Sequence, residues 1–343
     1  MSLTPLSCDI FCAVIDNLGD AGVCWRLARQ LAVEHGWRVR LWIDDPAPID
    51  GFAPGQAFVA VRKWDGDCAG VAPADIVIEA FACALPPAYV AAMAARRPAP
   101  VWLNLEYLSA EDWVAGCHGL PSPRHGLNKY FFFPGFAPGT GGLLREGDFA
   151  APPAPSFDGQ LEISQFCYDN PQLPALLAAW RDGGRPIRCQ VCAGLPNAQI
   201  AAWLGMPLPP GSTAERGNLT LTALPFLTQP DYDALLARCH LNFVRGEDSF
   251  VRAQWTERPF VWQIYPQADG AHFAKLDAFL ARYTGNAAAH AFFRAWNGAG
   301  SLDWPAFAAA LPALAASAPG WAKQIAAHGD LATNLARFCK DRL

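Results

Sequence analysis

Two carboxylates four residues apart follow a strand-like apolar run near the start of the sequence. Asp16 and Asp20 lie in the stretch DNLGDAG (16–22), between an apolar run at 8–15 and an amphipathic run at 21–36. In open α/β sheets, ligands bind at such strand-to-helix junctions. The plain alternative is that Asp20 only caps the helix while Asp16 only forms the turn. Two acids at such a junction favour binding of a basic molecule that accepts a transferred group, which they would hold or deprotonate.

The glycines of this stretch do not make a dinucleotide fingerprint. Gly19 and Gly22 match only the end of the pattern Gly-x-Gly-x-x-Gly, and an acid stands where backbone N–H groups should approach a pyrophosphate. Because a negative charge repels phosphate, we expect the donor of any transferred group to bind elsewhere.

A second junction, at residues 241–250, has the composition of an anion site. A strand-like run ends in Arg245, Gly246 allows close approach of the backbone, and the next helix offers the N–H groups of Glu247, Asp248 and Ser249. The two acids would crowd a diphosphate, so we expect their side chains to turn toward ribose or sugar hydroxyls. The alternative is an ordinary helix start in which Arg245 pairs with one of the acids.

Aromatic residues gather at strand ends in the same half of the chain. Phe166 and Tyr168 lie at the end of one strand-like run, Phe226 at the end of another, and Tyr265 at the end of a third. Each alone is more typical of a core. Together they predict a nucleotide pocket in which a base stacks on Phe226 and Gln229 reads its edge through hydrogen bonds.

The sequence gives little support for a metal. Asp65 and Asp67 form an Asp-x-Asp pair, but they lie mid-loop in the first half, far along the chain from the anion site. The eleven cysteines are scattered, and Cys189 and Cys192 have neither a second pair nor a suitably spaced histidine. We therefore predict no metal or other cofactor, and free, mostly buried thiols.

Apolar runs separated by helical patterns position these junctions. The strand-like runs of the first half span 8–15, 37–43, 75–81 and 101–107, and those of the second span 161–168, 186–193, 218–226, 241–246 and 260–265. Continuous apolar strands alternating with helices indicate parallel sheets covered on both faces. A Gly- and Pro-rich stretch at 134–157 marks a boundary between the two sets.

The predicted fold class is therefore α/β, with two facing Rossmann-like, doubly wound domains and a cleft between them, as in GT-B glycosyltransferases. We expect an acceptor-side domain at 1–155 and a nucleotide-sugar-binding domain at 156–320, with a C-terminal helix at 321–343 packing back on the first. A length of 343 residues fits two cores better than one.

Composition excludes several other classes of protein. The chain is 52% hydrophobic and 17% charged, which is far from the composition of disorder. Its net charge is -5, with no basic run longer than Arg96 and Arg97, which argues against a long nucleic acid as partner. No apolar run approaches the roughly 18 residues of a membrane span. We expect a cytoplasmic enzyme that binds neither membrane nor nucleic acid.

Four segments of the chain resemble the EarP family of protein-arginine rhamnosyltransferases, which modify bacterial elongation factor P. They are IFCAVIDNLGDAGVCWRLARQL (10–31), QFCYDNPQL (165–173), LPFLTQPDYDALL (224–236) and NFVRGEDSFVRAQWTERPFVWQIYPQ (242–267). The resemblance implies a GT-B fold, dTDP-β-L-rhamnose as donor, inversion to an α-linkage, and one arginine of the translation factor as acceptor, without metal.

The resemblance also implies roles for individual residues. The acceptor-side positions of the family fall on Asp16 and Asp20, and its thymine-binding positions fall on Phe226 and Gln229. Its other donor-contacting positions fall on Tyr168, Arg245, Glu247, Asp248 and Ser249. Weaker matches to donor positions are Phe166 and Tyr265.

The doubly acidic first junction suits an arginine acceptor, which is a cation of pKa above about 12. We expect Asp16 and Asp20 to orient the guanidinium and Asp20 to accept its proton as the C–N bond forms, while Arg245 and the helix N-terminus stabilise the departing diphosphate. Two alternatives stay open at this point: a nucleotide-sugar transferase with another acceptor, and a non-catalytic module that holds a basic partner.

Overall fold

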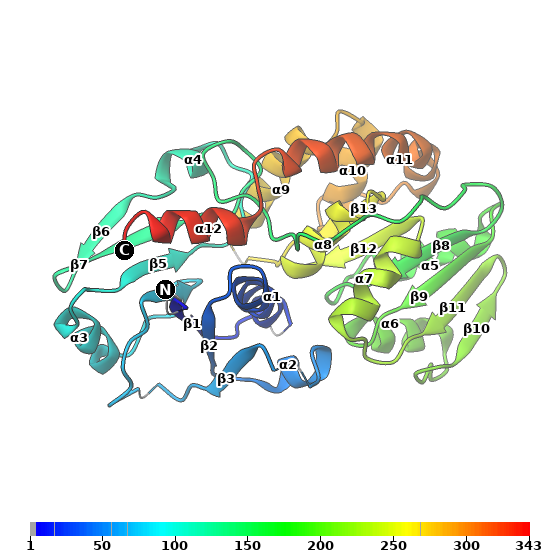
Figure 1. The fold of residues 1–343 in the computed structure, drawn as a ribbon. Coiled ribbons are helices and arrows are strands. Elements are labelled where there is room, and N and C mark those ends of the chain that lie inside the picture. The colour runs from blue at the N-terminus through cyan, green and yellow to red at the C-terminus, as the bar shows by residue number, and fades with distance from the viewer. Residues whose placement is uncertain (1–4, 17, 56, 67, 268) are drawn as a thin grey trace. The chain divides into compact units, whose positions relative to one another are not determined.

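The chain folds into two compact units in the computed structural model, which describes residues 5–16, 18–55, 57–66, 68–267 and 269–343. The first unit comprises Met1–Phe149 and Gln324–Leu343, and the second comprises Ala150–Lys323. Figure 1 shows the elements of both. From the sequence we placed the boundary between residues 155 and 156.

The first unit is built on a seven-stranded sheet in the order β3-β2-β1-β4-β5-β7-β6. All neighbours pair in parallel except β6 and β7. The strands are β1 (Ser7–Cys12), β2 (Arg38–Ile43), β3 (Val59–Lys63), β4 (Ile76–Ala80), β5 (Val101–Leu105), β6 (Pro121–Arg124) and β7 (Leu127–Phe132), and the helices are α1 (Gly19–Val33), α2 (Ala47–Phe52), α3 (Pro87–Ala95), α4 (Trp113–Cys117) and α12 (Leu331–Lys340).

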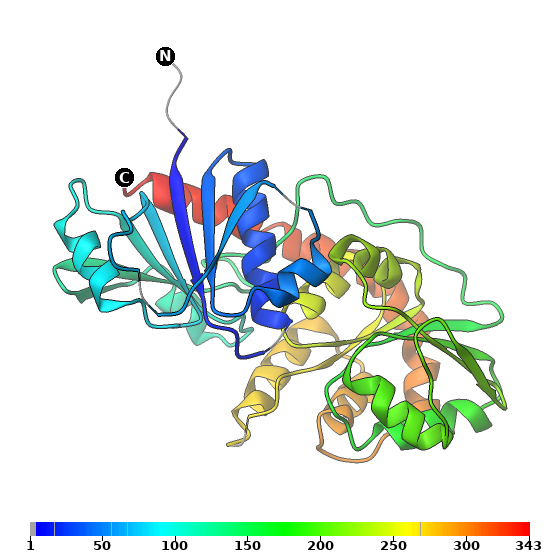
Figure 2. The ribbon, with the colours of Figure 1, turned by 90° about the horizontal axis from the view of Figure 1, so that it is seen from below.

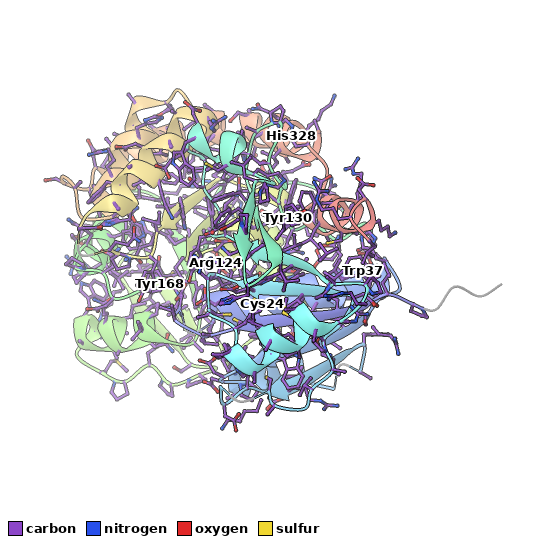
Figure 3. The ribbon with its side chains drawn as sticks, turned by 90° about the vertical axis from the view of Figure 1, so that its left-hand side faces the viewer. Cys24, Trp37, Arg124, Tyr130, Tyr168 and His328 are labelled. Carbon is purple, nitrogen blue, oxygen red and sulfur yellow. The ribbon has the colours of Figure 1, made fainter. Side chains whose placement is uncertain are left out.

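Helices cover both faces of this sheet, so every residue of its central strands β4 and β5 is buried. Helix α3 packs Tyr89 against the face that carries Phe11 and Trp102. Helix α1 lies on the opposite face, where Cys24 (Figure 3) is close to Cys12. Helix α12 lies beside α1 in Figures 1 and 2, far apart from it in sequence.

The second unit contains a six-stranded sheet in the order β10-β11-β9-β8-β12-β13. Only β10 and β11 pair antiparallel. The strands are β8 (Leu161–Gln165), β9 (Ile187–Val191), β10 (Thr213–Arg216), β11 (Leu219–Ala223), β12 (Leu241–Arg245) and β13 (Phe260–Gln263), and the helices are α5 (Leu173–Asp182), α6 (Leu195–Leu204), α7 (Gln229–Arg238), α8 (Asp248–Trp255), α9 (Ala271–Tyr283), α10 (Ala287–Trp296) and α11 (Trp304–Ala326).

An aromatic cluster forms part of the core beneath this sheet. The ring of Phe243 on β12 meets those of Trp180 on α5 and Trp296 on α10 edge-on, with centroids 5.7 and 5.0 Å away. These buried rings anchor strand β12, whose carboxyl end carries Arg245.

Among its parallel strands, each sheet reverses its strand order at one place, between β1 and β4 in the first unit and between β8 and β12 in the second. Such switch points are where doubly wound sheets bind ligands. The two junctions singled out in the sequence follow β1 and β12, so each lies at the switch point of its own sheet.

The C-terminal segment joins the first unit as predicted, but the prediction of a single helix over 321–343 is wrong. Helix α11 ends at Ala326, and α12 begins at Leu331. Gly329, at φ 77°, breaks the helical path, and Asp330 then caps α12 by accepting a hydrogen bond from the backbone N–H of Thr333. Across the residues described, none of the helices combines the length and the apolar character that a membrane span needs.

Candidate active site

Asp20 lies buried in the first turn of α1 and closes the loop in front of the helix. Its Oδ2 accepts hydrogen bonds from the backbone N–H groups of Ile15 and Asp16, both at 2.9 Å. Its Oδ1 accepts none from any residue that the structure describes. One carboxylate oxygen is thus fixed by the loop, and the other has no hydrogen-bond donor among the described residues.

The prediction that Asp20 caps a helix starting near Ala21 is wrong. Helix α1 begins at Gly19, and its N-cap residue is Leu18, whose side chain makes no capping hydrogen bond. The Asp20 carboxylate reaches back to the loop instead, because the chain between β1 and α1 turns its N–H groups toward the first helical turn.

The Asp16 carboxylate packs directly on Gly19. The backbone carbonyl of Asp16 accepts the Gly19 N–H at 2.6 Å. A Cβ atom on Gly19 would lie 2.5 Å from Asp16 Oδ2, so only glycine allows this side chain its present position. Asn17, between the two acids, lies outside the described residues.

A third carboxylate supports the same loop. Asp44, directly after β2, accepts the backbone N–H of Val14 on its Oδ1 at 2.9 Å. No local sequence signal marks Asp44, because only the pairing of β1 with β2 brings the two strand ends together. The first junction therefore holds Asp16, Asp20 and Asp44 around one short loop, an acidic environment suited to a cation.

The loop after β4, the strand that pairs with β1, is a second feature that the sequence does not reveal. Phe81, Ala82 and Ala84 all have positive φ (56°, 54° and 58°), a backbone region that costs non-glycine residues about 1–3 kcal/mol each. Phe81 stacks on Tyr107 with centroids 4.3 Å apart. No glycine or other sequence signal marks this turn.

A buried ion pair holds this loop in place. The Glu79 carboxylate accepts hydrogen bonds from Lys129 Nζ at 3.1 Å and from the backbone N–H of Ala84 at 3.2 Å. Both charged side chains are buried, so their pairing compensates much of the cost of removing them from water.

In the second unit, Arg245 is a buried cation surrounded by aromatic rings. It is 9% exposed, and its guanidinium carbon lies 4.4 Å from the ring centroid of Phe166 and 4.6 Å from that of Tyr168. The Phe166 N–H donates to the Phe243 carbonyl at 3.1 Å, which brings the ends of β8 and β12 together. The rings fix the orientation of the guanidinium through cation–π contacts.

No carboxylate pairs with Arg245 within the described part of the chain. The alternative in which Arg245 pairs with Glu247 or Asp248 is therefore wrong. A guanidinium carries five N–H donors and stays charged, so burying it without an anion is costly. An anionic ligand would remove that cost.

The turn from β12 into α8 is fixed by Ser249. Its hydroxyl donates to the Arg245 carbonyl and accepts the Arg245 N–H at 3.0 Å, while Gly246 adopts φ 59°. Glu247 is the N-cap residue, and Asp248 is the first residue of α8; both are half-buried. The helix N-terminus thus begins directly beside the arginine, an arrangement that favours anions.

The remaining predicted donor residues lie at or after the ends of strands β8, β11 and β13 of the same sheet. Tyr168 (Figure 3) meets the ring of Tyr265 edge-on, with centroids 5.6 Å apart. Tyr265 is 44% exposed and Phe226 is 49% exposed, which is unusual for such large rings. Gln229 is the first residue of α7. The nine donor-site candidates therefore come from the carboxyl ends of β8, β11, β12 and β13.

The metal and cysteine predictions concern other parts of the chain. Within the residues described, no three or more His, Cys, Asp or Glu side chains gather as a metal site would require. Asp67 lies outside the described residues, so the Asp-x-Asp pair stays untested. All eleven cysteines are free, and nine are buried. Burial raises the pKa of the Cys192 thiol to about 12, which keeps it protonated.

Comparison with known proteins decides the family. The sequence model of the Elongation-Factor P (EF-P) rhamnosyltransferase EarP matches residues 8–340. The chain belongs to the EarP family. This EarP-family chain is 48% identical to the protein-arginine rhamnosyltransferase of Pseudomonas putida, over 98% of its own length and 99% of that protein's. It is 45% identical to the Pseudomonas aeruginosa protein of the same name, over 98% and 100% of the two lengths.

Solved structures agree with this assignment. A structure that describes EarP-mediated arginine glycosylation of translation elongation factor EF-P matches 98% of this EarP-family chain and 100% of its own, with a TM-score of 0.69 and 36% identity. The glycosyltransferase VinC, in complex with dTDP, matches 98% and 100% of the two chains with a TM-score of 0.54 at 13% identity, which shows a shared fold alone.

The predicted EarP-family membership, the two Rossmann-like domains of a GT-B fold and the glycosyltransferase activity are therefore confirmed. The protein is an enzyme, a protein-arginine rhamnosyltransferase. The alternative of a non-catalytic binding module is wrong. The roles of the individual site residues stay predictions.

Proposed function

We propose that this enzyme transfers L-rhamnose from dTDP-β-L-rhamnose to an arginine side chain of translation elongation factor P, with inversion at the anomeric carbon. The observation that carries the donor half of the proposal is Arg245, a buried guanidinium without a carboxylate partner in the described residues, beside the start of α8. The acceptor half rests on Asp20, whose Oδ2 is fixed while its Oδ1 accepts no hydrogen bond from a described residue.

On the donor side, the diphosphate supplies the charge that Arg245 lacks. Two negative groups next to a guanidinium and a helix N-terminus form charge-assisted hydrogen bonds, which are stronger than neutral ones. In this proposal, thymine stacks on the exposed ring of Phe226 and Gln229 hydrogen-bonds its edge. The arginine and the helix then stabilise the diphosphate as it leaves with the electrons of the broken C–O bond.

On the acceptor side, the arginine arrives as a cation. Its pKa, above about 12, is too high for a carboxylate to remove the proton in advance. The nitrogen therefore loses its proton to Asp20 Oδ1 while it forms the bond to the anomeric carbon, and Asp16 holds the rest of the guanidinium. A single displacement of this kind inverts the anomeric centre and needs no covalent intermediate on the enzyme.

The proposed acceptor protein follows from the family. The matching family model is described by its action on elongation factor P, and the solved EarP structure concerns arginine glycosylation of the same factor. The proposal places the reaction in the cytoplasm, with no metal and no nucleic acid or membrane partner.

A donor panel tests the proposal. Purified enzyme and elongation factor P are incubated with dTDP-β-L-rhamnose, UDP-glucose or GDP-mannose, and the released nucleoside diphosphate is measured. We expect release from dTDP-rhamnose alone, and its loss when the acceptor arginine of the factor is replaced by lysine. Equal release from a uridine or guanosine donor would overturn the assignment of the base, and release without the factor would overturn that of the acceptor.

A further inference from the structure

A two-pronged ion pair joins the two helices whose N-termini carry the proposed donor site. Arg252 on α8 donates from Nε to Asp233 Oδ1 at 3.2 Å and from Nη2 to Asp233 Oδ2 at 2.8 Å. The arginine side chain is 4% exposed and the aspartate 17% exposed. A planar fork of this kind fixes both the distance and the angle between its partners.

The pair lies one helical turn behind the ligand-facing ends of both helices. Asp233 follows Gln229 by four residues on α7, and Arg252 follows Asp248 by four residues on α8. Residues four apart share one face of a helix and differ by about one turn along its axis. The ion pair therefore connects the helix that presents the base-reading residue to the helix that presents the diphosphate-binding turn.

A second contact ties α7 to the anion site. Tyr232, next to Asp233, meets the ring of Phe166 edge-on with centroids 5.6 Å apart. The same Phe166 ring lies 4.4 Å from the Arg245 guanidinium. Helix α7 is thus held at two points against the elements that surround Arg245.

We propose that the Arg252–Asp233 pair sets the separation of the base and diphosphate subsites, and so makes the donor site selective for an intact nucleoside diphosphate. This inference rests on the proposed donor site. A nucleotide carries its base and its phosphates at a separation limited by the ribose. One nucleotide can contact both subsites at once, and so bind with higher affinity, only when the spacing of the subsites matches the separation of its base and phosphates, as in any linked, two-point interaction.

Arg252 and Asp233 are positioning residues in this account, because neither touches the donor. Breaking the pair leaves each subsite with its own contacts and releases α7 from α8. The affinity for the linked ligand then falls, while the affinities for its two separate halves do not change. A purely structural role would lower all three affinities together, through loss of folded protein.

The test compares three probes on one variant. Asp233→Asn keeps the size of the side chain and one acceptor oxygen and removes the charge. We expect its Kd for dTDP to rise about 10-fold or more. The dissociation constants for thymidine and for inorganic pyrophosphate, measured by ligand-observed NMR titration, should stay within about twofold of the wild-type values. Arg252→Lys, which keeps the charge and loses the fork, should weaken dTDP binding to an intermediate extent.

A control on the same helix separates the pair from helix stability in general. Arg238 faces Glu162 at 3.9 Å, with exposures of 53% and 29%, so this ion pair contributes little. Arg238→Gln should bind all three probes like the wild type.

The outcomes distinguish this inference from the proposed function. Wild-type protein that fails to bind dTDP would overturn both. Wild-type protein that binds dTDP, together with a folded Asp233→Asn variant that binds it equally well, would overturn only the positioning role. Equal weakening of dTDP, thymidine and pyrophosphate by Asp233→Asn would overturn it as well.

Discussion

Replacing Asp20 by Asn tests the roles of the two carboxylate oxygens separately. In the structure, Oδ2 accepts the N–H groups of Ile15 and Asp16 at 2.9 Å, and Oδ1 is the oxygen that we propose takes the acceptor proton. An Asn side chain can place its one carbonyl oxygen at the Oδ2 position and keep both hydrogen bonds. Its NH₂ group then stands in place of Oδ1 and accepts no proton.

The magnitudes follow from these two roles. Hydrogen bonds to a charged acceptor contribute about 1.5–3 kcal/mol each and those to a neutral one about 0.5–1.5 kcal/mol. The two bonds together should therefore weaken by about 2 kcal/mol, which lowers Tm by several degrees. Loss of a general base slows a reaction by about 100-fold or more. Because Arg245 and the other donor residues are unchanged, the Kd for dTDP should match that of the wild type.

Three measurements on the variant check this prediction: Tm by calorimetry, Kd for dTDP by titration, and the single-turnover rate of rhamnose transfer. Asp44→Asn is the matched control, since Asp44 accepts the Val14 N–H at 2.9 Å in the same loop. We expect it to lose stability to a similar or smaller extent and to transfer rhamnose within a few-fold of the wild-type rate. A folded Asp20→Asn enzyme with the wild-type rate, or equal slowing by both variants, would refute the role given to Oδ1.

Three further predictions concern the anion site, metals and pH. Arg245→Met fills the space against the rings of Phe166 and Tyr168 without the charge. The variant should bind dTDP about 30-fold more weakly, a loss of about 2 kcal/mol, with no loss of Tm. An unchanged Kd for dTDP would remove Arg245 from the donor site. Transfer should continue in EDTA, since Arg245 and the N–H groups of α8 supply the positive charge that a metal ion would otherwise bring to the diphosphate. A loss of activity that magnesium or manganese restores would bring Asp65 back into consideration. Burial lowers the pKa of His118, whose Nδ1 accepts the Phe133 N–H at 3.0 Å. The unfolded chain therefore protonates this imidazole more readily, and the free energy of unfolding falls as the pH drops below about 6.5. His118→Asn should flatten that dependence in denaturation measured from pH 7 to 5, and an unchanged slope would contradict the assignment.

The strand-to-helix junctions could be located from the sequence because they depend on local pattern. Continuous apolar runs marked β1 and β12, and the polar residues directly behind them mark strand ends whatever the order of the sheet. The position of Arg245 at a switch point follows from this pattern as soon as β8 and β12 are neighbours.

The environment of each charged group could not be predicted in the same way, because it depends on neighbours far along the chain. The contacts of Arg245 with Phe166 and Tyr168 require that β8 and β12 pair. An aspartate at the start of a helix has the same local sequence whether it caps the helix or reaches back into the loop, so Asp20 was assigned the wrong partners.

The turn after β4 has no local sequence signature at all. Phe81, Ala82 and Ala84 have positive φ angles, and the Ala84 N–H binds Glu79, whose ion-pair partner Lys129 lies fifty positions away in the sequence.

The central claim is the transfer of one rhamnose to one arginine of elongation factor P. The most direct test is the intact mass of purified elongation factor P after incubation with this enzyme and dTDP-β-L-rhamnose, followed by fragmentation to locate the change. The account predicts a gain of one deoxyhexose, carried by a single arginine, and no gain with the Asp20→Asn enzyme. An unchanged mass with the wild-type enzyme, or a sugar on any residue other than arginine, would contradict it.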